Sequence, residues 1–249
     1  MKNLLKITSL ANAHIKELAL LNSAKERKLK GRVLVEGAHL VNEARKLGIL
    51  EEVLICSEAD YINGVSNILV TSDIIKKLST TTTPQNILGV AKVKEKDIVL
   101  SDTILILDGV SDPGNFGTIV RTAKAFDVAS IIVSNGSIDI YNEKVIRATQ
   151  GAIFKMPIVK MEILDAIKLL KDKGYKIYST ALKDAIDIEE VRDVDKYALI
   201  VGNEANGVSD EAIKLSDQVL KIQMQGDMES LNVAIASAIC IYTLNNKRK

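Results

Sequence analysis

The sequence predicts an α/β protein whose larger part holds a mostly parallel sheet. Along the whole chain, short apolar runs typical of buried strands alternate with segments of helical periodicity. Strands that are separated by helices tend to pair in parallel, with the helices covering both faces of the sheet. The chain has 249 residues, 47% of them hydrophobic, which is enough for one large domain or two modest ones with real cores.

The first part, residues 1–95, is expected to form a small α/β domain. Residues 12–30 suit a helix, and the segments after it continue the alternation. Strands are expected at GRVLVEG, EEVLICS, NILVTS and LGVAKV, and helices at AHLVNEARKLG and DIIKKLS. The stretch STTTTPQN is polar and rich in turn-forming residues, and the charged run KEKD follows the last strand. We place a domain boundary at this charged run.

The second part, residues 96–249, continues the alternation and is expected to carry the chemistry. Its expected strands are TILILD, ASIIVS, IFKMPIV, YKIYST, YALIVG and VLKIQM. One expected helix ends near Phe126, two cover 142–150 and 162–173, and a last one closes the chain. Several of these strands end in polar or glycine-rich turns, where ligands bind in open parallel sheets. The final helix, LNVAIASAICIYTL, is apolar almost all round, so we expect burial on more than one side, within the fold or against another subunit.

Composition argues against membrane, disulfide-bonded and metal-binding proteins. No apolar run reaches the roughly 18 to 20 residues that span a bilayer, and charge interrupts the N-terminus before a signal-peptide core. A soluble cytoplasmic protein is therefore expected. Cys56 and Cys240 lie far apart in apolar surroundings, which favours buried thiols. His14 and His39 lack the companion residues of a metal motif, so no metal is expected.

The N-terminal segment is strongly basic in an almost neutral chain. Residues 2–32 hold eight Lys and Arg against two Glu, whereas the whole chain has a net charge of +1. Such a segment suits a polyanion, because contacts to phosphate depend on Lys and Arg. A solvated helix face is an equally open interpretation. The candidate RNA contacts are Lys25, Lys28, Lys30 and Arg32.

The turn GVSDPGNFG, residues 109–117, joins an expected strand to an expected helix. Its first two glycines have the spacing of a P-loop, but the Gly-Lys pair of that loop is missing. Its glycines are never two residues apart, so the dinucleotide-binding fingerprint also fails. Asp112 has the position of an N-cap and Pro113 that of the first helical residue, which places Asn115 in the first turn of the helix.

Three turns of the second part resemble the motifs of one enzyme family when they are taken in order. They are LDGVSDPGNFGTIVRTA, LIVGNEANGVSDE and KIQMQGDMESLNVAIASA. These turns resemble the three motifs of the SpoU/TrmH-type RNA ribose 2′-O-methyltransferases of the SPOUT class. The segment GRVLVEGAHLVNE resembles that family's N-terminal RNA-binding domain, a ribosomal-protein-like substrate-binding domain. Gln223 stands where a proline is usual and Ala205 where a glycine is frequent, but neither departure removes a reactive side chain.

The resemblance implies a fold and a cofactor that composition and periodicity do not. The C-terminal SPOUT domain would form a deep trefoil knot, bind S-adenosylmethionine in that knot and work as a homodimer. The cofactor-binding positions that match are Thr180, Gly202, Ile222, Met224 and Leu231. Periodicity alone would make the last three of these core residues.

The resemblance also implies the catalytic positions, for transfer of a methyl group to a ribose 2′-hydroxyl. They are Asn115, Arg121, Glu204, Ser230 and Asn232. The family assigns Arg121 as the activating base, but arginine stays protonated in proteins. Gripping a phosphate of the RNA and stabilising a developing alkoxide is an easier role for it, and both roles stay open. Ser230 also has the sequence position of an N-cap for the final helix.

The expected substrate is structured RNA, in the first place 23S ribosomal RNA. This expectation follows from the N-terminal domain, which resembles that of the rRNA-modifying branch of the family. A tRNA ribose 2′-O-methyltransferase is one alternative, and a non-catalytic RNA-binding assembly protein of the same fold is another. The five polar residues at motif spacing argue against the second alternative, because a protein that only binds RNA does not need all of them.

Overall fold

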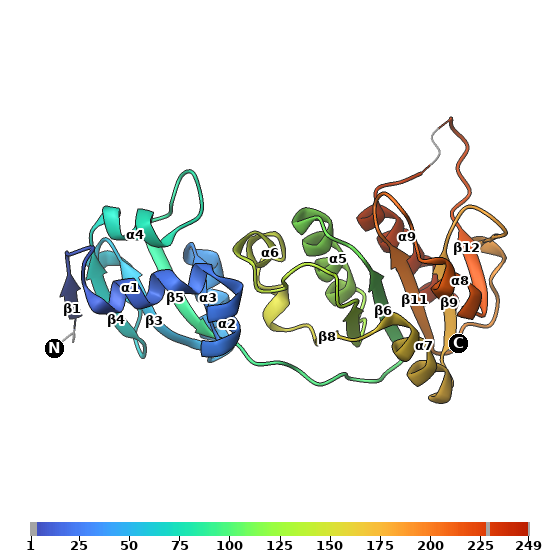
Figure 1. The fold of residues 1–249 in the computed structure, drawn as a ribbon, viewed down its shortest axis with the longest axis horizontal. Coiled ribbons are helices and arrows are strands. Elements are labelled where there is room, and N and C mark those ends of the chain that lie inside the picture. The colour runs from blue at the N-terminus through green and yellow to red at the C-terminus, as the bar shows by residue number, and fades with distance from the viewer. Residues whose placement is uncertain (1–3, 228–229, 249) are drawn as a thin grey trace. The chain divides into compact units, whose positions relative to one another are not determined.

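The computed structural model describes residues 4–227 and 230–248, and the chain divides into two compact units (Figure 1). Unit 1 comprises Met1–Lys94 and Asp139–Phe154, and unit 2 comprises Glu95–Ile138 and Lys155–Lys249. The chain therefore passes from the first unit to the second at residue 95. The segment 139–154 lies with unit 1, although the sequence pattern had assigned it to the second domain.

Unit 1 is built on a mixed sheet of five strands (Figure 1). Across the sheet the order is β1 (Leu4–Ile7), β4 (Ser66–Val70), β3 (Leu50–Ile55), β5 (Ile87–Lys92) and β2 (Arg32–Glu36). The first three strands are parallel to one another, and β5 runs antiparallel to both of its neighbours. The short strand β1 is an addition to the expected elements, since its four residues are too few to show a period.

Helices cover both faces of this sheet. They are α1 (Ala13–Ala19), α2 (Ala24–Lys30), α3 (Ala38–Lys46), α4 (Ser72–Leu78) and α6 (Glu143–Ala148), with 3-10 turns η1 (Leu20–Asn22), η2 (Glu58–Asp60) and η3 (Ala152–Phe154). α1 and α4 pack together over one core, in which Ile15 and Ile74 are fully buried, and α3 packs on β2, β3 and β5. The helix expected over 12–30 is interrupted, because Ser23 is extended; serine and asparagine favour such caps and turns over helix interiors.

Unit 2 is built on a parallel sheet of seven strands (Figure 1). Across the sheet the order is β10 (Ile186–Asp187), β12 (Gln218–Lys221), β9 (Lys176–Thr180), β11 (Tyr197–Gly202), β6 (Thr103–Asp108), β7 (Ser130–Val133) and β8 (Ile158–Lys160). Every pair of neighbouring strands in it is parallel. The expected α/β class with a mostly parallel sheet is thereby confirmed.

Four helices cover the two faces of the parallel sheet. They are α5 (Pro113–Ala125), α7 (Ile163–Asp172), α8 (Asp210–Leu215) and α9 (Val233–Asn246). α7 and α8 pack together over a core that includes Ile106 and Ile200, whereas α9 packs on α5 and β11. The closing helix is buried along one side only, because Ile235 and Tyr242 are 51% and 57% exposed.

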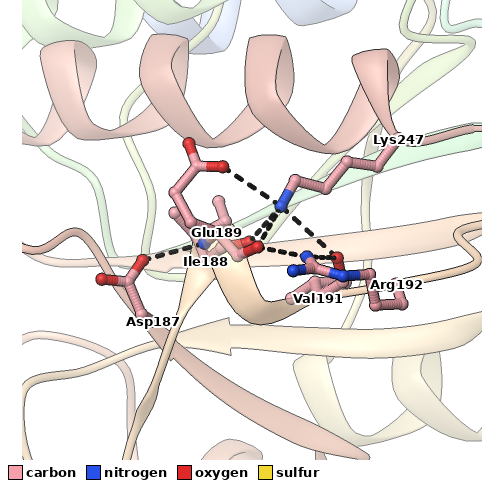
Figure 2. Close-up of polar contacts among 6 residues, drawn as sticks. All are labelled: Asp187, Ile188, Glu189, Val191, Arg192 and Lys247. Carbon is pink, nitrogen blue, oxygen red and sulfur yellow. Dashed lines mark hydrogen bonds and ion pairs between the residues drawn. The ribbon is translucent and has the colours of Figure 1, made fainter.

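The end of α9 is fastened to the 3-10 turn η4 (Ile188–Glu190) by Lys247 (Figure 2). The Lys247 ammonium donates hydrogen bonds to the carbonyls of Ile188, Glu189 and Val191, at 3.1, 2.6 and 3.4 Å. It also lies 3.2 Å from the Glu189 carboxylate. A lysine that satisfies the last carbonyls of a turn acts as its C-terminal cap. The C-terminal segment is thus held against the loop that precedes β11.

Among the described residues, none of the helices is both long enough and apolar enough to span a bilayer.

Candidate active site

The candidate site lies where β6 and β11 end side by side. Gly202, the last residue of β11, pairs in register with Asp108, the last residue of β6. The turns 109–112 and 203–207 therefore leave the sheet from neighbouring positions. The sheet extends from β6 through β7 and β8 in one direction and from β11 through β9 in the other, so this is a topological switch point. Ligands of open parallel sheets bind at such points.

A pocket of about 710 Å³ opens at this edge of the sheet, which is within the size range of small-molecule sites. Its walls come from the ends of β9, β11 and β12, the loops after them and the start of α9. All five residues that the resemblance implied as cofactor contacts line it: Thr180, Gly202, Ile222, Met224 and Leu231. Ile222 and Met224 are only half-buried, so plain core packing does not account for them.

Gly202 is required by the folding of the loop beside it. A Cβ at this position would lie 2.0 Å from the carbonyl carbon of Gly207 and 2.1 Å from the nitrogen of Val208. The backbone groups of Asn203 and Gly207 exchange two hydrogen bonds of 3.0 and 2.9 Å, which close the loop 203–207 tightly against the strand end. Only glycine permits backbone to approach this closely. The pocket wall is therefore backbone at this point.

The first turn of α5 is organised as expected from the sequence. Asp112 accepts a hydrogen bond of 2.7 Å from the backbone N–H of Asn115, and Pro113 occupies the first position of the helix. The expected N-cap is thus confirmed. A proline is favoured there because its missing N–H and fixed φ suit a helix start. The cap fixes the backbone of Asn115 in the first turn of α5.

One side chain from each of the three motifs joins a single hydrogen-bonded chain. The Asn232 amide donates to Asn115 Oδ1 at 2.8 Å, and the Asn115 amide donates to Glu204 Oε1 at 2.9 Å. Glu204, Ser230 and Asn232 line the pocket, whereas Asn115 is not part of its lining and links Glu204 to Asn232. Four of the five predicted catalytic residues therefore lie at the pocket or in contact with its rim.

Asn232 also caps α9, which corrects one expectation. Its Oδ1 accepts hydrogen bonds from the N–H groups of Ala234 and Ile235, at 2.9 and 3.3 Å. The N-cap role suggested by sequence position for Ser230 therefore belongs to Asn232, because the helix begins two residues later than expected. Ser230 stays exposed at the pocket. Residues 228 and 229 of the third motif lie outside the described residues.

In the described part of the chain, Arg121 is the one predicted catalytic residue that neither lines the pocket nor hydrogen-bonds to a residue that does. It lies on the exposed side of α5, and its guanidinium makes no hydrogen bond or ion pair with the rest of the chain over residues 4–227 and 230–248. The structure therefore does not bring it together with Asn115, Glu204 and Asn232. An exposed guanidinium without a partner is free to bind a group from outside the chain.

The four predicted RNA contacts of unit 1 divide into two pairs. Lys25 and Lys28 are exposed on α2, without a partner in the described part of the chain. Lys30 instead forms an ion pair with Glu17 at 2.9 Å, and Arg32 forms one with Glu51 at 2.6 Å.

Two further observations concern the contacts that the basic segment makes inside unit 1. The hydrogen bond from Lys30 lowers the pKa of Glu17, so the contact favours the charged form of that carboxylate. Arg27, counted in the same basic run, is 6% exposed and ion-paired with Asp139 at 2.5 Å. The charge that remains for an external polyanion is smaller than the composition indicates.

Both cysteines are free, as expected, but only Cys240 is fully buried. Cys240 lines the pocket, and burial raises its pKa to about 12, so the thiol stays protonated near neutral pH. Cys56 is half-buried, and burial together with Asp60 raises its pKa. Within the described residues no group of three or more His, Cys, Asp and Glu side chains is placed to hold a metal ion.

Two polar residues of the strand-end turns at the site were not among the predicted site residues. Asn203 donates a hydrogen bond of 2.8 Å to the carbonyl of Gly109, and Asp108 accepts one of 2.9 Å from the N–H of Ser209. Both residues tie the first motif to the second. The sequence signal that could have identified them as site residues is their position, at the end of an apolar strand or directly after it.

A parallel sheet with a small-molecule pocket at its switch point, rimmed by amide and carboxylate side chains from three ordered motifs, defines an α/β domain suited to bind a small ligand. Residues 102–242 match the family described as "SpoU rRNA Methylase family", and residues 12–89 match the family described as "MRM3-like substrate binding domain". The chain belongs to the SpoU rRNA methylase family.

Relatives and solved structures support the same assignment over nearly the whole chain. The chain is 36% identical to the 23S rRNA (guanosine(2553)-2′-O)-methyltransferase RlmP of Bacillus subtilis, over 96% of this chain and 98% of the relative. An AdoMet-bound rRNA methyltransferase from Sinorhizobium meliloti superposes with a TM-score of 0.86, at 27% identity and 98% coverage of each chain. An RNA 2′-O ribose methyltransferase superposes with a TM-score of 0.83, at 28% identity, over 98% of this chain and 99% of the other.

These findings confirm the resemblance that was stated on the three turns. The protein is an RNA 2′-O-methyltransferase of the SpoU/TrmH type, with S-adenosylmethionine as its cofactor. It carries an N-terminal substrate-binding domain.

Proposed function

We propose that this protein methylates a ribose 2′-hydroxyl of 23S ribosomal RNA, with a guanosine as the first target to examine. The single observation that carries the proposal is the pocket at the ends of β9, β11 and β12, lined by all five predicted cofactor residues and rimmed by Glu204, Ser230 and Asn232. The name of the Bacillus subtilis relative, which matches along nearly its whole length, supports 23S rRNA as the substrate.

The residues of the pocket fit S-adenosylmethionine. Strand ends and the loop after Gly202 offer backbone N–H and C=O groups, which suit the polar edge of an adenine. Ile222, Met224 and Leu231 offer apolar surface, and Leu231 is 39% exposed, so it can cover a bound ring. Thr180 lines the pocket at the end of β9, where its hydroxyl donates to the Ile200 carbonyl at 3.3 Å.

The cofactor supplies, when bound, a methyl group already activated by a positively charged sulfur. What remains for the chain is to hold the ribose in line and to accept the proton of its 2′-hydroxyl. We assign proton acceptance to Glu204, because a carboxylate accepts a proton and a guanidinium does not. The Asn115 amide at 2.9 Å holds one Glu204 oxygen, and the other oxygen is left to face the substrate.

Arg121 takes the role of a phosphate clamp in this proposal. Its exposed position on α5, outside the pocket, suits contact with the RNA backbone better than contact with the cofactor. A guanidinium binds phosphate through two parallel hydrogen bonds, which fix orientation as well as supply charge. Clamping the phosphate beside the target nucleotide would align the ribose with Glu204.

A homodimer in the cytoplasm is part of the same proposal, as is the trefoil knot that the resemblance implies. Ile235 and Tyr242 give α9 an exposed apolar stripe, which favours contact with a second copy. Ile235→Glu should therefore reduce the mass measured by light scattering from dimer to monomer. Leu215→Glu, at a leucine 37% exposed on α8 over the other face, should leave the dimer intact. A wild-type protein that is monomeric at micromolar concentration would contradict this part.

The test of function is methylation of defined RNAs by the purified protein. With labelled S-adenosylmethionine, we expect incorporation into 23S rRNA from cells that lack the gene, and none into 23S rRNA from cells that have it. Ribose-methylation mapping should then show one 2′-O-methylated nucleotide that depends on the gene. Incorporation into tRNA alone would favour the tRNA alternative. Cofactor binding without methylation of either RNA would support a non-catalytic assembly protein.

A further inference from the structure

We propose that Asn203 is a positioning residue. Its side chain links the turn 109–112 before α5 to the loop 203–207 and thereby sets how Asn115 contacts Glu204. The inference rests on the proposed function, in which Asn115 and Glu204 serve the methyl transfer. Asn203 itself touches neither of the two catalytic side chains through a side-chain hydrogen bond.

Both ends of the Asn203 side chain are used. Its Oδ1 accepts hydrogen bonds from the N–H groups of Ala205 and Asn206, at 2.8 and 3.2 Å. This half is an Asx turn, which many loops have for purely local reasons. Its Nδ2 donates to the carbonyl of Gly109 at 2.8 Å, which crosses from the loop after β11 to the turn after β6. Only this second half can transmit a position from one motif to another.

The turn at Gly109 depends on neighbouring side chains for its conformation. Gly109 has a φ of 78°, in the left-handed region that glycine adopts readily. Its N–H donates to Ser134 Oγ at 3.1 Å, and its carbonyl accepts from Asn203. Both polar groups of this residue are therefore held by side chains from the ends of β7 and β11. A flexible residue held on both sides has its position fixed by those contacts.

Three side-chain contacts join the first motif to the second. The first is Asp108 with the N–H of Ser209 at 2.9 Å, and the last is Asn115 with Glu204 at 2.9 Å. Along the first motif, the contact from Asn203 to Gly109 lies between these two, and Asn203 directly precedes Glu204 in the chain. Losing the middle contact should leave the loops folded, since the outer two and the Asn203–Gly207 backbone pair persist. The expected damage is a small displacement, to which reaction rates are far more sensitive than binding is.

Asn203→Asp separates the two halves of the side chain. A carboxylate keeps an acceptor for the N–H groups of the Asx turn, but it places an oxygen against the Gly109 carbonyl where an N–H₂ donates. We expect calorimetric affinity for S-adenosylmethionine to stay within about threefold of wild type, and the single-turnover methylation rate to fall by at least about tenfold. Hydrogen exchange in a peptide covering 109–116 should become faster.

A pH series gives the signature that a merely structural role lacks. As pH falls, the new carboxyl group becomes protonated and can donate to the Gly109 carbonyl. The rate of the variant divided by the wild-type rate should therefore rise toward acid pH. Asn203→Ala, which has neither half, should lose cofactor affinity as well as rate and show no such rise.

Asn246→Asp is the matched control, because it makes the same charge change at an exposed residue at the end of α9. It should match wild type in rate, affinity and exchange. A wild-type rate for Asn203→Asp, or a loss of cofactor affinity as large as the loss of rate, would overturn the inference. If the wild-type protein methylates no RNA, the proposed function fails, whereas hydrogen exchange and cofactor binding still decide the role of Asn203.

Discussion

The two regions to which the sequence assigned function are built in opposite ways. The three motifs of unit 2 meet through side chains far apart in the chain, as in the contacts from Asn232 to Asn115 and from Asn115 to Glu204. Part of the basic segment of unit 1 is engaged within its own unit, where Lys30 and Arg32 pair with Glu17 and Glu51. A pattern of ordered motifs therefore located a site, whereas a count of charges located only a region.

The reason for the difference is geometric. A motif at the end of a parallel strand has its place fixed by the sheet, so three such motifs converge whatever lies between them. A charge on a helix or strand surface has no such constraint, and it pairs with whatever carboxylate is near. Ion pairs at the surface contribute little to stability, but they compete with an external phosphate for the same cation.

The largest effect is expected at Gly202, where one added methyl group would displace the loop 203–207 from the end of β11. In Gly202→Ala the new Cβ meets backbone atoms of Gly207 and Val208, which cannot move aside as a flexible side chain can. We expect a loss of about 3 kcal/mol in stability, at the upper end for overpacking, and cofactor affinity too weak for calorimetry. Thermal unfolding and titration with S-adenosylmethionine measure the two effects.

Gly136→Ala is the control for this substitution. Nothing lies within 4 Å of a Cβ at Gly136, and its φ is not in the left-handed region. Its stability should stay within about 0.5 kcal/mol of wild type. If Gly202→Ala binds S-adenosylmethionine as the wild type does, the loop 203–207 is not the wall of the cofactor pocket.

The next largest effect is expected at Arg121. Substitutions there test whether unit 2 binds the RNA at a place separate from the cofactor pocket. Arg121→Ala should lower the single-turnover methylation rate by about 10² to 10³, the range for removing one stabilising donor, with cofactor affinity unchanged. Arg121→Lys keeps the charge but loses the two-pronged contact, so we expect weakened but measurable activity. Lys124→Ala, an exposed cation on the same helix, is the matched control.

The pH dependence of Arg121→Lys distinguishes the two roles left open by the sequence. A lysine loses its proton more readily than an arginine, so a base at this position would give a residual rate that climbs differently with pH from that of wild type. A phosphate clamp should leave the shape of the profile unchanged. Near-normal turnover by Arg121→Ala, or outright loss of its cofactor binding, would contradict the placement of Arg121 on the RNA side.

Most of the fold was predictable because its strands and helices have clear periods. The strands TILILD and YALIVG are continuous apolar runs, and both are found at the centre of the parallel sheet. Short elements were missed, such as β1 and β10, since a few residues carry no period. The assignment of 139–154 to unit 1 was also missed, because docking such as the ion pair of Asp139 with Arg27 depends on tertiary contacts.

The sequence predicted where the candidate site residues lie in the fold, but not the contacts among them. Ordered motifs identified Glu204 and Asn232, while the hydrogen bonds that join them through Asn115 depend on χ angles that sequence does not specify. Ser230 was given the N-cap that Asn232 holds, because both residue types favour this position and they are two residues apart. Asn203 was missed since an asparagine after a strand is the usual sign of a turn.

The smallest effect is expected in unit 1, where it sharpens the contrast between free and engaged cations. Each phosphate contact contributes about 0.7 to 0.9 to the steepness of the plot of log K for RNA against log salt. If Lys25 and Lys28 contact phosphates, changing both to Gln should therefore make this slope shallower by about 1.4 to 1.8. Changing Lys30 and Arg32 to Gln should lower it by less than half as much, because Glu17 and Glu51 already neutralise them. Filter binding across a salt series measures both slopes, and cofactor affinity should stay constant in both variants. Equal losses for the two pairs would show that RNA displaces the internal carboxylates, and unchanged slopes would leave the whole segment as a solvated surface of unit 1.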